Sequence, residues 1–130
     1  MRLLIVRHAE AAPGSPDELR TLTRDGREHA LDLGRRLREE GVRPDVILSS
    51  PLLRARETAQ ALGLGEPEVD ERLAPGASPQ DIREAAEGRG ETVIVVGHQP
   101  DCSQAVAALT GAAEPKFPPC AYAVIELEPE

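Results

Sequence analysis

The chain has 130 residues, a net charge of −8 at pH 7 and a sequence pI of about 4.9. This length predicts one domain over residues 1–130, large enough to bury a core and too small for a second domain. An acidic chain lacks the basic face that nucleic-acid backbones require, and no segment has the pattern of a membrane span or a secretory leader. We therefore expect a cytoplasmic protein whose partners are neither nucleic acids nor membranes.

The chain begins with a short apolar run at residues 3–6 that ends in Arg7 and His8. Four consecutive apolar residues, Ile and Val among them, predict a strand that is buried on both faces. Ligands of open α/β sheets bind outside the carboxyl ends of the strands, so Arg7 and His8 lie where a binding or catalytic pair is expected. The alternative is a hydrogen-bonded histidine at a strand end beside a surface arginine.

Residues 11–22 predict a loop that crosses the mouth of this crevice, because they hold prolines and glycine and little apolar periodicity. Arg20 lies in this loop. Thr23 is a suitable cap for the helix that follows, which should run to about Glu40. His29 falls in this helix among charged neighbours and after no strand, so we expect it on the surface and assign it no role.

A second strand is predicted at residues 46–48, followed by a helix start. Ser50 can cap this helix, with Pro51 at its first position. Arg54 would then lie in or beside the first helical turn. Backbone N–H groups at a helix start, together with an arginine, form a suitable site for an anion.

Residues 63–79 are rich in glycine and proline and predict a long irregular connection with one short strand near Val69. The next helix should begin at Ser78 and Pro79, with Asp81 completing the cap, and should end by residues 88–90.

A further β-branched run at residues 92–96 ends in Gly97 and His98. Two of the three histidines thus follow buried strands that could lie side by side in a parallel sheet. A helix should follow Pro100 and end at Gly111, and a weakly alternating strand near residues 121–127 suits a sheet edge.

The two cysteines, Cys102 and Cys120, are far apart and have no metal or redox spacing. They are expected to be small core residues, although the sequence leaves a disulfide open.

Strands that alternate with helices predict an α/β fold, a three-layer α/β/α sandwich with a mainly parallel central sheet. Four motifs in order also resemble the histidine phosphatase superfamily. They are Arg7-His8-Ala9-Glu10, Leu22-Thr23 with Gly26, Ser49-Ser50-Pro51-Leu52-Leu53-Arg54-Ala55 with Glu57-Thr58-Ala59, and Gly97-His98. The short length and residues 20–23 resemble the SixA-type phosphohistidine phosphatases, the smallest branch of this superfamily, which implies a phosphoglycerate-mutase-like fold.

The resemblance implies a covalent mechanism in which His8 attacks phosphorus and water then releases phosphate. It implies that Arg7, Arg54 and His98 act with His8 in catalysis, and that Arg7, Arg20, Arg54 and His98 bind the phosphoryl group. Positive charge around His8 would favour its neutral, nucleophilic form. The resemblance requires no metal and no other cofactor.

The sequence departs from the family pattern at two places. Ala9 replaces a common glycine, a change of one small residue for another. Many relatives that hydrolyse esters carry a glutamate shortly after a pair resembling Arg72-Leu73, but here Pro75 lies at about that position. Glu71 is close in sequence, but an acidic residue of an acidic protein is most often a solvated surface group.

Three functions therefore stay open. The first is a phosphohistidine phosphatase that acts on a phosphorylated protein, the second is a small-molecule phosphomonoesterase, and the third is a non-catalytic module that binds phosphate or a phosphoprotein. The pair His8 and His98 argues against the third. The missing acid favours a P–N bond, since imidazole leaves more easily than an alkoxide. The sequence leaves the oligomeric state open.

Overall fold

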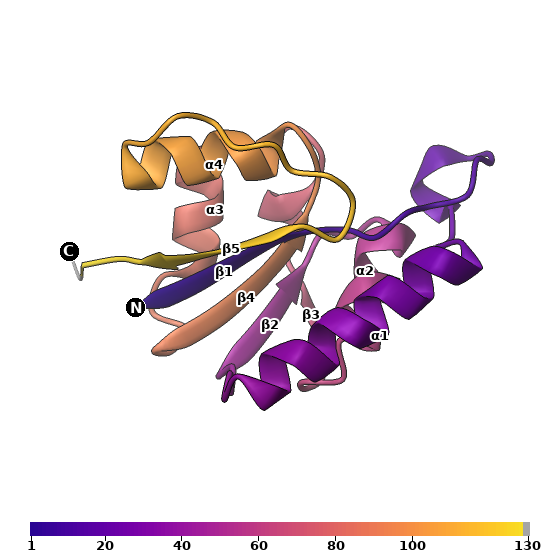
Figure 1. The fold of residues 1–130 in the computed structure, drawn as a ribbon. Coiled ribbons are helices and arrows are strands. Elements are labelled where there is room, and N and C mark those ends of the chain that lie inside the picture. The colour runs from indigo at the N-terminus through magenta and orange to yellow at the C-terminus, as the bar shows by residue number, and fades with distance from the viewer. Residues whose placement is uncertain (129–130) are drawn as a thin grey trace.

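A computed structural model, which describes residues 1–128, has one five-stranded sheet at its centre (Figure 1). The strands are β1 (Arg2–Arg7), β2 (Val46–Ser49), β3 (Glu68–Val69), β4 (Thr92–Gly97) and β5 (Tyr122–Glu126), and their spatial order is β3-β2-β4-β1-β5. Four strands are parallel, and β5 pairs antiparallel with β1 at the sheet edge. The predicted short strand at Val69 and the predicted edge strand are both confirmed.

Helices cover both faces of this sheet (Figure 1). The helices α1 (Arg24–Glu39) and α2 (Leu53–Ala61) lie on one face, and α3 (Pro79–Ala86) and α4 (Asp101–Thr110) lie on the other. Two short 3-10 turns, η1 (Asp17–Leu19) and η2 (Glu71–Leu73), belong to the connections. The prediction of a three-layer α/β/α sandwich is confirmed.

The strand β1 is buried on both faces, as its apolar run predicts. Leu3 and Ile5 belong to the core beneath α3 and α4, whereas Leu4 and Val6 belong to the core beneath α1 and α2. All four side chains are fully buried. This alternation follows from the two-residue period of a strand.

The pairing of β1 with β4 brings the two strand-end histidines together. The register joins Arg7 to Gly97, so the next residue of each strand is a histidine. The backbone N–H of His8 donates to the carbonyl oxygen of Gly97 at 3.0 Å. The prediction that two histidine-terminated strands lie side by side in a parallel sheet is confirmed.

Three of the predicted helix ends are confirmed. Thr23 Oγ1 accepts a hydrogen bond from the N–H of Gly26 at 2.9 Å, and Ser78 and Asp81 form a reciprocal capping box. Gly111 ends α4 in the left-handed conformation, with φ of 74°. His29 is exposed on α1, as expected.

The predicted cap of α2 is wrong. The helix begins at Leu53, and its cap residue, Leu52, makes no side-chain capping bond. The reason is that the N–H of Ser50 donates to Val96 O at 3.0 Å, which keeps Ser50 attached to the end of the sheet. Arg54 nevertheless lies in the first turn of α2, where it was predicted.

Both cysteines are free thiols within residues 1–128 and pack in the core, as expected. Burial raises the pKa of Cys102 to about 12 and the pKa of Cys120 to about 11, so neither is a thiolate at neutral pH. No helix within residues 1–128 is both long enough and apolar enough to cross a bilayer.

Candidate active site

His8 follows β1 directly, and one short hydrogen bond fixes its ring. Its Nδ1 lies 2.7 Å from the carbonyl oxygen of Ala9. A carbonyl oxygen only accepts hydrogen bonds, so Nδ1 carries the proton, and the lone pair of the neutral ring lies on Nε2. The N–H of Ala9 donates in turn to Thr58 Oγ1 at 3.0 Å, which attaches this turn to α2.

His98 follows β4 and lies beside His8. The two ring centroids are 5.3 Å apart, and the ring planes are inclined by 59°. His98 is only 4% exposed, and its Nε2 lies 2.7 Å from Ser50 Oγ. Ser50 Oγ also accepts a hydrogen bond from the N–H of Leu52 at 3.2 Å. Ser50, predicted as a helix cap, therefore holds the second histidine in place.

Arg7 contributes a donor that has no partner. Its Nη1 donates to Phe117 O at 3.0 Å, but its buried Nε has no hydrogen-bond partner among residues 1–128. Buried polar groups of native proteins almost always have a partner, so this buried guanidinium nitrogen is an exception to that rule.

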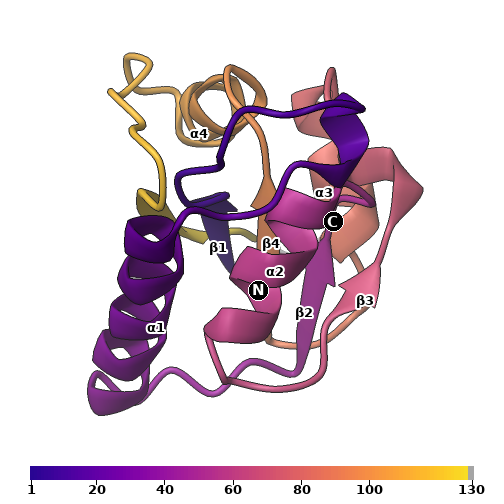
Figure 2. The same cartoon turned by 90° about the vertical axis from the view of Figure 1, so that its right-hand side faces the viewer.

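Arg54 and Arg20 meet at the carboxylate of Asp17. Arg54 Nη2 lies 3.2 Å from Asp17 Oδ2, and Arg20 Nη1 lies 3.1 Å from Asp17 Oδ1. Arg20 Nε also donates to Ala12 O at 2.9 Å. Figure 2 shows how this becomes possible, because the segment between β1 and α1 passes over α2 and carries η1 to it.

Burial and nearby positive charge lower the pKa of both histidines. Burial lowers the pKa of His8, the hydrogen bond to Ala9 opposes this, and the positive charges of Arg54, Arg7 and Arg20 lower the pKa further. Burial also lowers the pKa of His98 to about 4, with smaller contributions from His8 and Arg54. Both rings are therefore neutral at pH 7, and the structure brings His8, His98 and the three arginines to one place.

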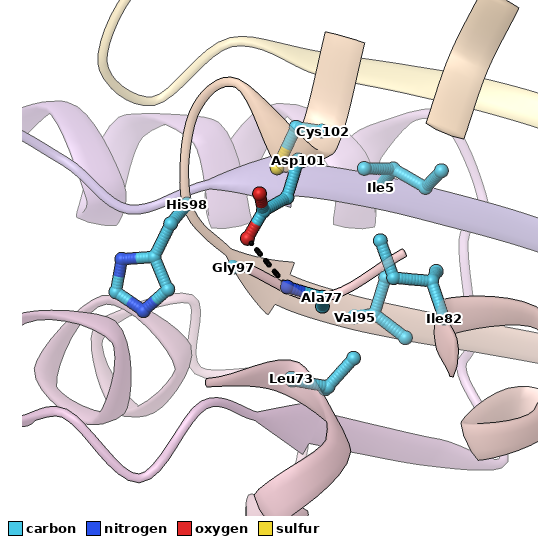
Figure 3. A pocket seen from close by; sticks show the side chains of 9 residues that line it. All are labelled: Ile5, Leu73, Ala77, Ile82, Val95, Gly97, His98, Asp101 and Cys102. Atoms are coloured by element: carbon cyan, nitrogen blue, oxygen red, sulfur yellow. Dashed lines mark hydrogen bonds between the residues drawn. The ribbon is translucent and has the colours of Figure 1, made fainter. Parts of the chain in front are cut away.

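A small cavity lies behind His98, on the side of α3 and α4 (Figure 3). The volume in which a water molecule could be centred is only about 10 Å³, so the cavity is too small for a substrate. In Figure 3, His98 lies on one side of Asp101, and the apolar side chains of Ile5 and Val95 lie on the other. Asp101 Oδ2 accepts hydrogen bonds from the N–H groups of Gly76 and Ala77 at 2.9 and 3.1 Å. Asp101 therefore anchors the loop that follows Leu73.

No carboxylate near Arg72 and Leu73, where many relatives carry an acid, is placed to act as a catalytic acid among residues 1–128. Glu71 is exposed in η2, and the Arg72 guanidinium bonds to Asp70, with Nη2 2.8 Å from Oδ2. Residues 74–76 hold no acidic side chain. Burial raises the pKa of Asp101, but its carboxylate is engaged with the loop backbone.

Sequence reasoning missed the support of Ser50 for His98 and the contact of Asp17 with the two arginines. The only sequence signal for Asp17 was its position three residues before Arg20, a spacing that also occurs between unrelated surface charges. Within residues 1–128, no group of three or more His, Cys, Asp or Glu side chains is arranged to hold a metal ion. Independence from a cofactor remains a prediction.

Buried His98 should make the stability of the fold depend on pH. Its pKa is about 4 in the folded chain, against 6.5 for an ordinary histidine, so the unfolded chain binds a proton that the folded chain does not. This contribution is present above pH 6.5 and is lost as pH falls toward 4, by up to about 1.4 kcal/mol for each pH unit. Urea unfolding at pH 7 and pH 4.5 should therefore show a smaller pH effect in His98→Asn than in the wild type.

The control is His29→Asn, which removes an exposed histidine on α1 and should keep the full pH effect. An equal loss of stability at pH 4.5 in His98→Asn and in the wild type would contradict the assignment of His98 as a buried neutral ring.

Residues 3–75 match the sequence profile of the histidine phosphatase superfamily (branch 1). An uncharacterized protein of Picosynechococcus sp. is 35% identical over 115 residues, which cover 80% of this chain and 70% of that protein.

Solved structures of SixA-type phosphatases resemble this chain over almost its whole length. The protein histidine phosphatase SixA complexed with tungstate has a TM-score of 0.88 and 27% identity, over 98% of this chain and 89% of that chain. A protein of Agrobacterium tumefaciens with the provisional name phosphohistidine phosphatase SixA has a TM-score of 0.82 and 29% identity, over 95% and 89% of the two chains. The profile covers more than half of the sequence, and the order of motifs agrees with it, so the chain belongs to branch 1 of the histidine phosphatase superfamily and is of the SixA type.

Proposed function

We propose that this phosphatase acts through His8 as the nucleophile and removes the phosphoryl group from phosphohistidine side chains of a protein. The observation that carries the nucleophile assignment is the bond of His8 Nδ1 to Ala9 O at 2.7 Å. This bond fixes the tautomer and gives Nε2 the lone pair that must attack phosphorus.

The phosphoryl oxygens would be held by Arg7, Arg20, Arg54 and His98. Arg7 lies next to His8 in the chain, and Arg54, which is only 7% exposed, keeps donors that Asp17 does not use. Guanidinium groups suit the tetrahedral phosphoryl group because they donate pairs of parallel hydrogen bonds. Tungstate, which was present in the related SixA structure, is a tetrahedral oxyanion like phosphate.

The reaction has two steps that share one intermediate. In the first, His8 Nε2 forms a bond to phosphorus while the bond from phosphorus to the substrate imidazole breaks, and the imidazole nitrogen takes a proton from solvent. In the second, a water oxygen attacks the same phosphorus, the bond to His8 breaks, and phosphate leaves with neutral His8 restored. Catalysis of this kind depends mainly on position and charge, which the arginines would supply.

The substrate class follows from the leaving group. An alkoxide leaves with a pKa far above neutral and gains about 10²–10⁴-fold from a positioned acid. No acid takes this role after Leu73, since Glu71 is exposed and Asp101 is bonded to the loop backbone. An imidazole can leave as a neutral ring once solvent has protonated it, so this site should work best on P–N bonds.

The test compares catalytic efficiency on two substrate classes under identical conditions. We expect kcat/KM for a phosphohistidine peptide and for phosphoramidate to exceed that for sugar phosphates by about 100-fold or more. Orthovanadate, which copies five-coordinate phosphorus, should inhibit turnover. The His8→Ala variant is the control for contaminating phosphatases on both classes.

A clear preference for alkyl esters would overturn the assignment to P–N bonds, and Glu71→Gln and Asp101→Asn would then identify the acid. Binding of phosphate without turnover of either class would instead support a non-catalytic phosphate-binding module.

A further inference from the structure

Asp17 joins two arginines that come from different parts of the chain. Its Oδ1 accepts from Arg20 Nη1 at 3.1 Å, and its Oδ2 accepts from Arg54 Nη2 at 3.2 Å. Its backbone carbonyl oxygen also accepts from Arg54 Nη1 at 3.0 Å. One short turn, η1, thus contacts both guanidinium groups that face the same substrate in the proposed function.

These contacts leave donors for a substrate. A guanidinium has five N–H donors in a fixed plane. Asp17 takes one from each terminal nitrogen of Arg54, which leaves three for a phosphoryl group. Arg20 gives its Nε–H to Ala12 O and one donor to Asp17, which also leaves three. A phosphoryl group can therefore bind beside Asp17 without displacing it.

The charges explain why a carboxylate is needed here. Two guanidinium groups that approach one phosphate repel each other until the anion is bound. The Arg54 side chain is 9% exposed, whereas the Asp17 side chain is 61% exposed, so the carboxylate reaches the pair from the solvent side. The hydrogen bond from Arg20 is the main cause that lowers the pKa of Asp17, and Arg54 adds to it, so Asp17 stays ionised at neutral pH.

The segment that carries Asp17 is itself held at both ends. Ala11 and Leu22 form an antiparallel bridge, and the N–H of Ala12 donates to Thr21 O at 2.8 Å. Within residues 1–128, the hydrogen bonds that attach η1 to α2 are those that the Arg54 guanidinium donates to Asp17. Ala12 O fixes one end of the Arg20 guanidinium, and Asp17 links its other end to Arg54.

We propose that Asp17 is a positioning residue that holds Arg20 and Arg54 in the geometry in which both bind one phosphoryl group. This inference rests on the phosphate pocket of the proposed function. It assigns Asp17 no contact with the reacting atoms. The opposite possibility is that Asp17 competes with the substrate for the arginines, and the experiment separates the two.

The experiment measures the binding of inorganic phosphate and orthovanadate by titration calorimetry, so that its result does not depend on turnover. Asp17→Asn keeps the size of the side chain but turns an N–H₂ group or an uncharged oxygen toward the arginines. Its affinity for both anions should fall by about 10- to 100-fold, the loss expected when one hydrogen bond to a charged group is no longer formed. Glu18→Gln removes the same charge from the adjacent exposed residue and should bind as the wild type does.

A second measurement distinguishes positioning from a general effect on the fold. In an Arg20→Ala background, Asp17→Asn should weaken anion binding much less than it does alone, because the group that Asp17 positions is already gone. Thermal unfolding should be similar for Asp17→Asn and Glu18→Gln.

If Asp17→Asn bound the anions as tightly as the wild type or more tightly, the proposal would be wrong and Asp17 would compete with the substrate. If the losses of affinity from Asp17→Asn and Arg20→Ala were fully additive, Asp17 would act independently of Arg20, which would also overturn the proposal. A wild type that binds neither anion would overturn it together with the pocket. The proposed function could also fail while the inference about Asp17 holds. In that case anion binding would depend on Asp17, but no phosphorylated substrate would be turned over.

Discussion

Replacement of His8 by alanine should lower turnover by a factor on the order of 10⁴ or more, because it removes the atom that forms the bond to phosphorus. The fold should remain, since the backbone N–H of His8 keeps its bond to Gly97 O and the hydrogen bond lost with the side chain is the local one to Ala9 O. Phosphate release from phosphoramidate, measured beside the unfolding temperature, checks both expectations.

The intermediate gives a second readout for His8. Rapid denaturation of the wild type during turnover should trap a phosphoryl group that is labile in acid and stable in base, as expected for a phosphorus–nitrogen bond. His8→Ala should trap none, and His29→Ala, which changes an exposed histidine of α1, should trap as much as the wild type. Near-normal activity of His8→Ala would rule out a covalent role for this histidine.

Arg54→Lys should lower kcat/KM by about 10- to 1000-fold although it keeps the positive charge. Lysine has its three donors on one nitrogen, so it cannot reproduce the planar fork that spans the backbone oxygen and the carboxylate of Asp17 and still faces a phosphoryl group. Arg54 is also 7% exposed, so the shorter donor has little room to adjust. Steady-state kinetics on phosphoramidate measures the loss.

Arg56→Lys is the matched control for this variant, because Arg56 lies on the same helix and is exposed. It should leave kcat/KM unchanged. If Arg54→Lys also had no effect, Arg54 would have to be removed from the phosphate site.

The sequence was most informative where local pattern determines structure. The apolar runs before His8 and His98 predict buried strands, and the common edge of parallel strands then predicts that the two histidines meet, as their ring separation of 5.3 Å confirms. The caps at Thr23 and Ser78 were also predictable, because a cap joins residues only three positions apart.

Contacts between distant segments were not predictable in this way. Ser50 has the sequence features of a helix cap, but its hydroxyl contacts His98, a residue 48 positions away. Asp17 and Arg54 are 37 positions apart, and nothing in either local pattern indicates that η1 packs against α2. Such pairs depend on how loops close over the sheet, which local preference does not specify.

The bridge between Ala11 and Leu22 separates the tip of the intervening segment from the sheet, so the tip can be extended. Both of its ends are fixed to each other, and Gly14 near its tip has only Arg20 Cγ within 4 Å of an added Cβ, at 3.7 Å. Extra residues inserted at Gly14 would extend outward from the mouth while the histidine-bearing strands stay unchanged. A longer loop inserted at this position could therefore cover the site and enclose small substrates. The substrate range would then change while the sheet that carries the two histidines stays the same.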